Sequence, residues 1–270
     1  MSHIETALLD IRGLDALSVR DSPLRRIDPR AKTLTALAFI VAVVSFGKYE
    51  IAGLIPLVVY PIALMAVDGL PPRIVLSKVL LALPFVALIG AFNPVFDRAA
   101  MVRIGPLDIS GGWISFASIL LKSLLTLSAA VILIATTGFS AVCVALDRLR
   151  VPRVFVVQLL LLYRYLFVLA EEAARMLRAW SLRSAGRRRL PLGAFGPFAG
   201  QLLLRSMDRA DRIHAAMLSR GFDGRMRTDR VLRFRAVDAV FVLAWVALFV
   251  AARLYNAPRA LGEAVMRSLP

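Results

Sequence analysis

The stretch ISFASILLKSLLTLSAAVILIATTGF, residues 114–139, decides the fold class, because its 26 residues carry a single charge, Lys122. A helix rises about 1.5 Å per residue, so about 20 mainly apolar residues cross the hydrocarbon core of a bilayer. The stretch is therefore predicted to be a transmembrane helix. The rest of the chain agrees, since 59% of its 270 residues are hydrophobic and the mean hydropathy is +0.73. Such values indicate an integral membrane protein.

Four further apolar stretches are predicted to cross the membrane: residues 33–46, 51–67, 75–96 and 236–254. The first of them is short and forms a tight hairpin with the second around Gly47-Lys48-Tyr49-Glu50. Pro71 and Pro72 end the second helix and prepare the third. We therefore expect an all-α, polytopic membrane protein with about five transmembrane helices.

The distribution of lysine and arginine predicts the orientation. The turn after the first span holds only Lys48, whereas five cations precede that span: Arg20, Arg25, Arg26, Arg30 and Lys32. The N-terminus is therefore expected in the cytoplasm. The predicted division is a cytoplasmic segment 1–32, a four-helix membrane region 33–139, a cytoplasmic domain 140–235, and a last span with an outer tail 236–270. Residues 1–20 lack a continuous apolar run, so no cleaved signal peptide is expected.

The predicted cytoplasmic domain is strongly basic. Residues 144–235 hold nineteen arginines, no lysine and seven acids, which is +12 of the chain's net charge of +16. Two long amphipathic helices are predicted there, from Pro152 to about Leu182 and from about Phe198 to Ser219, with a glycine- and proline-rich break between them. On the charged face of the second helix, Asp208 and Arg212 have the spacing of an i,i+4 ion pair.

Residues 154–170 are apolar enough to form a sixth span. A crossing there would place the triple arginine 187–189 outside and bury Arg164 near the bilayer centre, at a cost of at least about 2.5 kcal/mol. We therefore interpret residues 154–170 as part of a helix that runs under or obliquely against the membrane domain. The triple arginine is then expected to face anionic lipid headgroups.

Each amphipathic helix ends in a short tripeptide with a central arginine: Leu182-Arg183-Ser184 and Ser219-Arg220-Gly221. Arginine complements the negative end of a helix dipole, and the nearby glycines permit left-handed caps, which would explain one such end. Two such ends, on one basic region below a membrane domain, favour a docking role. An arginine at a protruding tip can enter an acidic groove and make a bidentate contact.

Several motifs together resemble the transmembrane T component of an energy-coupling factor transporter, of the cobalt or nickel (CbiQ-like) type. Only Arg183, Arg220 and Gly221 match the family's paired Ala-Arg-Gly-like signatures; the flanking Leu182, Ser184 and Ser219 depart from them. The remaining motifs are Arg26-Ile27-Asp28-Pro29-Arg30-Ala31-Lys32, Leu146-Asp147-Arg148-Leu149-Arg150-Val151-Pro152, Tyr163-Arg164-Tyr165 and Glu171-Glu172-Ala173-Ala174-Arg175-Met176.

The resemblance implies a noncatalytic subunit of an ATP-driven importer in a bacterial or archaeal cytoplasmic membrane. Such a subunit lies between a pair of cytoplasmic P-loop ATPases and a membrane-embedded, CbiM-like S component that binds the substrate. Arg183 and Arg220 would each dock into a groove on one ATPase, and the helices that carry them would transmit ATPase closure to the S component. The implied substrate is cobalt for cobalamin synthesis, with nickel left open.

The sequence lacks motifs for chemistry of its own. It has no Gly-x-x-x-x-Gly-Lys-Ser/Thr motif, so we expect no cofactor in this chain and ATP on the partner subunits. No metal site is expected, because His3 and His214 are far apart in the sequence and Cys143 has no companion. An autonomous secondary transporter or channel stays the main alternative, although the spans show few polar groups at mid-membrane. An intramembrane enzyme and a nucleic-acid binder are less favoured.

Two charged residues within or beside the spans have open roles. Lys122 is expected either to reach the outer headgroups or to face a subunit interface. Asp238 lies at the start of the last span and is expected to pair with Arg235.

Overall fold

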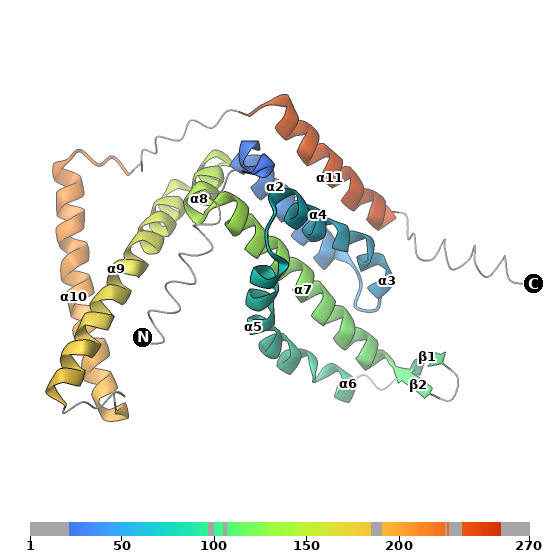
Figure 1. The fold of residues 1–270 in the computed structure, drawn as a ribbon, viewed down its shortest axis with the longest axis horizontal. Helices are drawn as coiled ribbons and strands as arrows, with labels where there is room; N and C mark the ends of the chain where they lie inside the picture. Colours follow the sequence, from blue (N-terminus) through green and yellow to red (C-terminus); the bar gives the residue numbers. More distant parts are fainter. Residues whose placement is uncertain are drawn as a thin grey trace, which may run out of the picture. The chain divides into compact units, whose positions relative to one another are not determined.

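The computed structural model describes residues 22–96, 100–104, 107–184, 191–224, 226 and 234–254 (Figure 1). These residues are mainly helical, which confirms the predicted all-α class. The described part adds a short antiparallel hairpin of β1 (Ala100–Ile104) and β2 (Leu107–Ser110), where the sequence patterns predict no element. The chain divides into two compact units. We name them the membrane unit, Leu17–Gly138 with Leu232–Pro270, and the arginine-rich unit, which contains Phe139–Val231.

The membrane unit is built around α7 (Gly111–Thr137), which packs against most of the other helices of that unit. The last helix, α11 (Ala236–Leu254), packs mainly on α2 (Pro29–Ser45). The remaining helical segments are η1 (Pro23–Arg26), α3 (Ile51–Leu54), η2 (Pro56–Val58), α4 (Val59–Asp68), α5 (Pro72–Gly90) and α6 (Asn93–Phe96).

Two of the predicted spans differ from the observed helices for local reasons. The second span is broken into α3, η2 and α4, since Pro56 has no N–H to continue the helical ladder. The third span ends at Gly90 instead of Phe96, and α6 follows after a turn. At Gly90, a Cβ atom would lie 2.8 Å from the Phe116 ring, so α5 approaches α7 more closely than a side chain would permit.

Five helices in the described part are long and apolar enough to cross a membrane. Their number agrees with the prediction of about five spans, but the set differs. Helix α2 has 17 residues and is not among them, whereas the helix that contains residues 154–170 is. Its placement outside the membrane stays a prediction. The five are Ile51–Asp68, Pro72–Gly90, Gly111–Thr137, Arg153–Arg183 and Ala236–Leu254.

An aromatic cluster joins three helices in the core of the membrane unit. Phe39 of α2 stacks on Tyr60 of α4 with ring centroids 4.5 Å apart. Trp245 and Phe249 of α11 meet the Tyr60 ring edge-on, at 4.9 and 5.3 Å. Edge-on and stacked pairs of this kind stabilise a core beyond the apolar area that they bury. The cluster holds the last helix against the first hairpin.

A buried carboxylate, Asp238, joins the first turns of α2 and α11. Its Oδ1 accepts the main-chain N–H of Asp28 at 2.8 Å, and its Oδ2 accepts that of Arg235 at 2.7 Å. Asp28 is itself the N-cap of α2, with its side chain accepting the N–H of Arg30. The predicted contact between Asp238 and Arg235 is therefore present, but it runs through the main chain. Asp238 as a whole residue is 1% exposed.

Lys122 binds neighbouring main chain, a role that neither sequence interpretation included. Its Nζ donates to the carbonyl oxygens of Phe46 at 2.6 Å and Gly47 at 3.2 Å, just beyond the end of α2. The same turn holds Glu50, whose carboxylate pairs with Arg253 of α11 at 3.1 Å. Arg253 also donates to the carbonyl of Ser45. Cations thus bind carbonyl groups at the end of α2 and in the turn that follows it.

The arginine-rich unit consists of α8 (Phe139–Arg148), α9 (Arg153–Arg183) and α10 (Leu192–Ser219). Helix α8 packs on α9, where the rings of Phe139 and Tyr163 stack with centroids 4.5 Å apart. Helix α10 begins six residues before the predicted Phe198, so the predicted glycine- and proline-rich break was too long. Pro197 lies within the early turns of α10, where its missing N–H removes a single helical bond without ending the helix.

Arg150 lies two residues beyond the end of α8, and its backbone is in the left-handed region at φ +69°. Two bonds close the turn: the N–H of Arg150 donates to Asp147 and that of Val151 to Leu146. Glycine usually fills this position because a Cβ atom is strained there. We expect Arg150→Gly to raise the free energy of unfolding by about 0.5–1 kcal/mol, read as a higher midpoint of thermal unfolding.

The control for this expectation is Arg148→Gly, the same exchange at the last helical residue of α8. There glycine loses helix propensity and should destabilise by about 1 kcal/mol. If Arg150→Gly lowered the midpoint as much as Arg148→Gly, contacts of the Arg150 side chain would outweigh the backbone strain.

Candidate functional site

The first predicted docking arginine, Arg183, is the last residue of α9 and is exposed. Leu182 beside it is 85% exposed, so an apolar side chain accompanies the charge at the tip. Ser184 caps the helix in a right-handed conformation, with φ −100°, and its N–H donates to the carbonyl of Trp180 at 3.0 Å. The predicted glycine cap at Gly186 lies outside the described residues.

The second docking arginine, Arg220, is the C-cap of α10 and is also exposed. Gly221 follows in the left-handed region at φ +76°, as predicted for this tripeptide. The N–H of Gly221 donates to Leu218 at 2.9 Å, and that of Phe222 donates to Met217 at 3.0 Å. These two bonds form the Schellman motif, so Gly221 orders the chain directly after the docking arginine. Ser219, also exposed, donates its hydroxyl to the carbonyl of Ala215.

The left-handed glycine leads to a testable prediction. Gly221→Ala should cost about 1 kcal/mol, because the Cβ atom is strained at this φ angle even though no heavy atom lies within 4 Å of it. Hydrogen exchange of the Gly221 and Phe222 amides should speed up severalfold. Gly200→Ala is the control, since Gly200 lies inside α10 with open space around it and should gain helix propensity instead. Equal exchange rates in both variants would contradict the cap.

Helices α9 and α10 form an antiparallel pair (Figure 1). Near one end of the contact, Arg220 lines a groove together with Arg164 and Asp223. Further along, Glu172 of α9 contacts Arg205 of α10. From Arg164 to Arg183 the helix advances about 28 Å at its usual rise per residue. The two docking arginines therefore lie at opposite ends of the pair, separated by about 30 Å.

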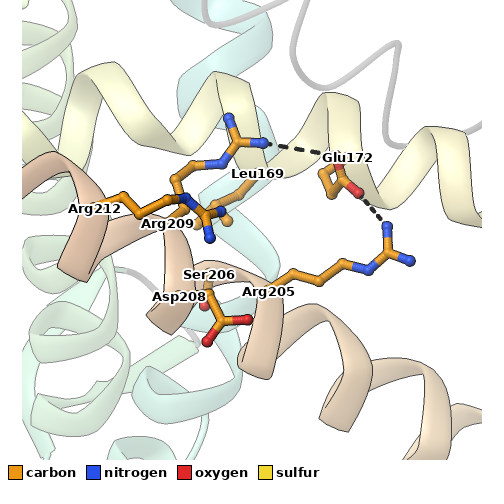
Figure 2. A pocket seen from close by; sticks show the side chains of 7 residues that line it. All are labelled: Leu169, Glu172, Arg205, Ser206, Asp208, Arg209 and Arg212. Atoms are coloured by element: carbon orange, nitrogen blue, oxygen red, sulfur yellow. Dashed lines mark hydrogen bonds and ion pairs between the residues drawn. The ribbon is translucent and has the colours of Figure 1, made fainter.

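Glu172 is a polar contact between the two helices that sequence reasoning missed (Figure 2). Its Oε1 accepts Arg205 at 2.7 Å, and its Oε2 accepts Arg175 of the same helix at 2.5 Å. Arg209 of α10 approaches Oε2 at 3.9 Å. Glu172 lies in the charged half of α9, beyond the apolar residues 154–170. Hydrogen bonds from Arg175 and Arg205 hold the pKa of its carboxyl below the usual range.

Glu172, Arg205 and Arg209 line a pocket between α9 and α10. Asp208 and Arg212, the residues predicted to pair along α10, line the same pocket (Figure 2). The motif that includes Glu172 is visible in the sequence, but its partner on α10 depends on how the two helices are aligned. No spacing rule within one helix gives that alignment.

An apolar groove between α9 and α10 borders this polar crossing. His214 lines it beside Met217 and Phe222, in agreement with its predicted place on the apolar stripe. The described residues contain no group of His, Cys, Asp or Glu side chains that could hold a metal ion. The features of this unit are therefore two exposed arginine tips and a charged crossing between them.

The comparisons with known proteins show the family to which this chain belongs. Residues 20–230 match the sequence profile of the CbiQ family, described as cobalt transport protein. The cobalt transport protein CbiQ of Salmonella typhimurium is 30% identical over 215 residues, which cover 73% of this chain and 91% of that protein. A protein of the same name from Rhodobacter capsulatus is 37% identical over 121 residues, 44% of this chain and 48% of that protein.

A third relative joins two components in one chain. The putative fused cobalt transport protein CbiMQ of Methanocorpusculum labreanum is 26% identical over 235 residues, which cover 81% of this chain and 38% of that protein. The family profile covers well over half of this chain, and the apolar helices fit a transporter. The chain is a multi-pass membrane protein that belongs to the CbiQ family of cobalt transport proteins.

Proposed function

We propose that this chain is the T component of an energy-coupling factor importer, the membrane scaffold that transmits ATPase movement to a substrate-binding subunit. The observation that carries the proposal is the placement of Arg183 and Arg220. Both are exposed and each ends a long helix, and because the two helices run in opposite directions the arginines lie towards opposite ends of the pair (Figure 1). Two separate contacts on a pair of ATPases fit this arrangement better than one contact surface.

Each arginine would enter an acidic groove on one ATPase and form a bidentate, charge-assisted contact. Helices of 31 and 28 residues would then carry a displacement from the ATPase to the other subunits. ATP would bind to the ATPases and not to this chain, which is therefore noncatalytic. For this, α9 and α10 must lie in the cytoplasm, with the N-terminus on the same side.

The substrate-binding partner would be a CbiM-like membrane protein. The fused relative supports this, since its name places CbiM and CbiQ in one chain. The transported ion would be cobalt, in accord with the family description, with nickel as the competing ion. The ion would bind to the S component. Anionic lipids would contact the triple arginine 187–189, which lies outside the described residues.

The first test is copurification from native membranes, with a tag on this chain and identification of the bound proteins by mass spectrometry. Recovery of a P-loop ATPase together with a small apolar membrane protein is the expected result. The second test is ATP-dependent cobalt uptake by the reconstituted complex. Excess nickel is added as a competitor to compare the two ions. Recovery of this chain alone, with cobalt uptake after reconstitution of the chain by itself, would support an autonomous carrier instead.

A further inference from the structure

The crossing of α9 and α10 depends on a single carboxylate surrounded by cations. Both oxygens of Glu172 are engaged, one by Arg205 of α10 and the other by Arg175 of α9. Arg209 of α10 lies within 4 Å of the same carboxylate. The side chain of Glu172 is 14% exposed, whereas those of Arg175 and Arg205 are each 53% exposed. The carboxylate is thus the inner member of the cluster, and Figure 2 shows its contacts with Arg205 and Arg209 of α10.

Apolar packing contributes little to fixing this crossing. Helix α10 has no buried residue, and several of its large apolar side chains stay more than half exposed. Apolar contacts are non-directional, so a loosely covered apolar face permits one helix to slide or rotate on the other. A carboxylate held by guanidinium groups from both helices is directional. The direction of α10 relative to α9 therefore depends strongly on Glu172.

Removal of the negative charge would do more than delete two hydrogen bonds. Arg175 on α9 would then face Arg205 and Arg209 on α10 without a carboxylate between them. Like charges at this distance repel, although solvent reduces the repulsion because the arginines are partly exposed. The ionic contact at the crossing would change from attraction to repulsion, which is reduced by Glu171 because its charge also interacts with Arg175.

A small change at the crossing becomes larger at the helix ends. Glu172 lies eleven residues before Arg183, about 16 Å along α9, and Arg205 lies fifteen residues before Arg220, about 22 Å along α10. A rotation of about 10° at the crossing moves either tip by about 3–4 Å. That exceeds the range of about 0.5 Å over which hydrogen bonds keep their geometry.

We propose that Glu172 is a positioning residue: it fixes the crossing of α9 and α10 and thereby the spacing of Arg183 and Arg220. The geometric part of this proposal, that Glu172 fixes the crossing and the spacing, depends only on contacts within the arginine-rich unit. The consequence for ATPase docking rests on the proposed function.

The geometric part is tested by measuring a distance within the full-length chain in lipid nanodiscs. Spin labels are attached at Ala179→Cys on α9 and Ala215→Cys on α10, both exposed positions, in a chain with Cys143→Ala. Pulsed electron resonance then gives the distribution of distances between the labels. In the parent chain we expect a narrow distribution, and in Glu172→Gln a broad or shifted one.

Two further variants make the result specific. Glu172→Arg combined with Arg205→Glu restores an opposite-charge pair between the helices and should narrow the distribution again. Asp211→Asn is the matched control, because it removes one carboxylate from an exposed position of α10 and should leave the distribution unchanged. A parent-like distribution in Glu172→Gln would overturn the proposal, and so would an exchanged pair that stays as broad as the single variant.

The docking part has its own measurement, the affinity of the purified ATPase for the reconstituted chain. Glu172→Gln should weaken it about tenfold, and the charge-exchanged pair should recover most of the loss. A parent-like affinity in Glu172→Gln, despite a broadened distribution, would overturn the link between the crossing and docking. If the parent chain bound no ATPase at all, the proposed function would fail, but the distance measurement would still decide the role of Glu172.

Discussion

Arg183→Glu combined with Arg220→Glu is expected to abolish copurification of the ATPase while leaving the chain inserted in the membrane. Truncation of one partner in a buried, hydrogen-bonded charge pair costs about 2–5 kcal/mol, and reversal of the charge adds repulsion from the acidic groove. Two such losses sum to about 4–10 kcal/mol, which is comparable to the binding free energy of a micromolar complex, about 8 kcal/mol, even before the repulsion is added. Both side chains are exposed in the chain alone, so the fold should tolerate the change.

The single variants test whether both arginines contact an ATPase or only one of them does. If each arginine contacts a different ATPase subunit, Arg183→Glu and Arg220→Glu should each weaken binding by a similar factor. Arg183→Lys is the conservative variant, because lysine keeps the charge but lacks the planar fork that binds a carboxylate bidentately. Its affinity should fall between those of the parent and Arg183→Glu.

The matched control is Arg148→Glu with Arg153→Glu. It makes the same change in net charge within the arginine-rich unit, at exposed positions away from both the tips and the crossing of α9 and α10. Copurification in this control, together with its loss in the tip variant, would assign binding to the tips and not to the overall charge of the basic region. Normal copurification of the ATPase with the tip variant would contradict the proposal that Arg183 and Arg220 dock on it.

The sequence patterns predict the long helices well because each of these is a continuous apolar run with a sharp border. The last span, Ala236–Leu254, is observed at its predicted bounds, and α7 is displaced by only two or three residues at each end. A charged residue or glycine at the border makes the change in environment abrupt. The start of α10 is missed because glycine and proline weaken a helix without forbidding one.

The candidate site is predictable only as far as its local chemistry extends. The left-handed Gly221 follows from the sequence of one helix end, and the structure confirms it. The partners of Glu172, Lys122 and Asp238 lie 33, 76 and 210 residues away along the chain. Their contacts depend on how separate helices align, and a pattern within one helix carries no information on that alignment.

Asp238 gives the second large expected effect, a loss of stability in the membrane unit. In Asp238→Ala, the main-chain N–H of Asp28 would lose its partner in a buried site, and that of Arg235 would lose its partner in a part-buried one. An unsatisfied buried donor costs about 1–3 kcal/mol, so we expect a loss of about 2–3 kcal/mol in the free energy of unfolding. The midpoint of thermal unfolding, followed by fluorescence in detergent, should fall by several degrees.

Asp238→Asn distinguishes the two reasons for which the residue could matter. The amide oxygen can still accept one of the two N–H groups, but its NH₂ group would face the other donor. If Asp238 acts as an acceptor for two helix starts, the asparagine variant should therefore lie between the parent and the alanine variant. If its negative charge were what the fold requires, asparagine would be as damaging as alanine. Asp211→Ala, at an exposed position of α10, should change the midpoint little and serves as the control.

The expected order of the unfolding midpoints, with the parent highest and Asp238→Ala lowest, also concerns how the two ends of the membrane unit are joined. Asp28 and Asp238 are 210 residues apart, and the arginine-rich unit lies between them in the sequence. The carboxylate accepts main-chain N–H groups at the starts of both α2 and α11, so it joins two segments that are far apart in the sequence. Loss of Asp238 should therefore release α11 from α2 before it disturbs α5 and α7. Hydrogen exchange should show faster exchange at the start of α11, with α7 still protected. Uniform loss of protection across the membrane unit would contradict this local role.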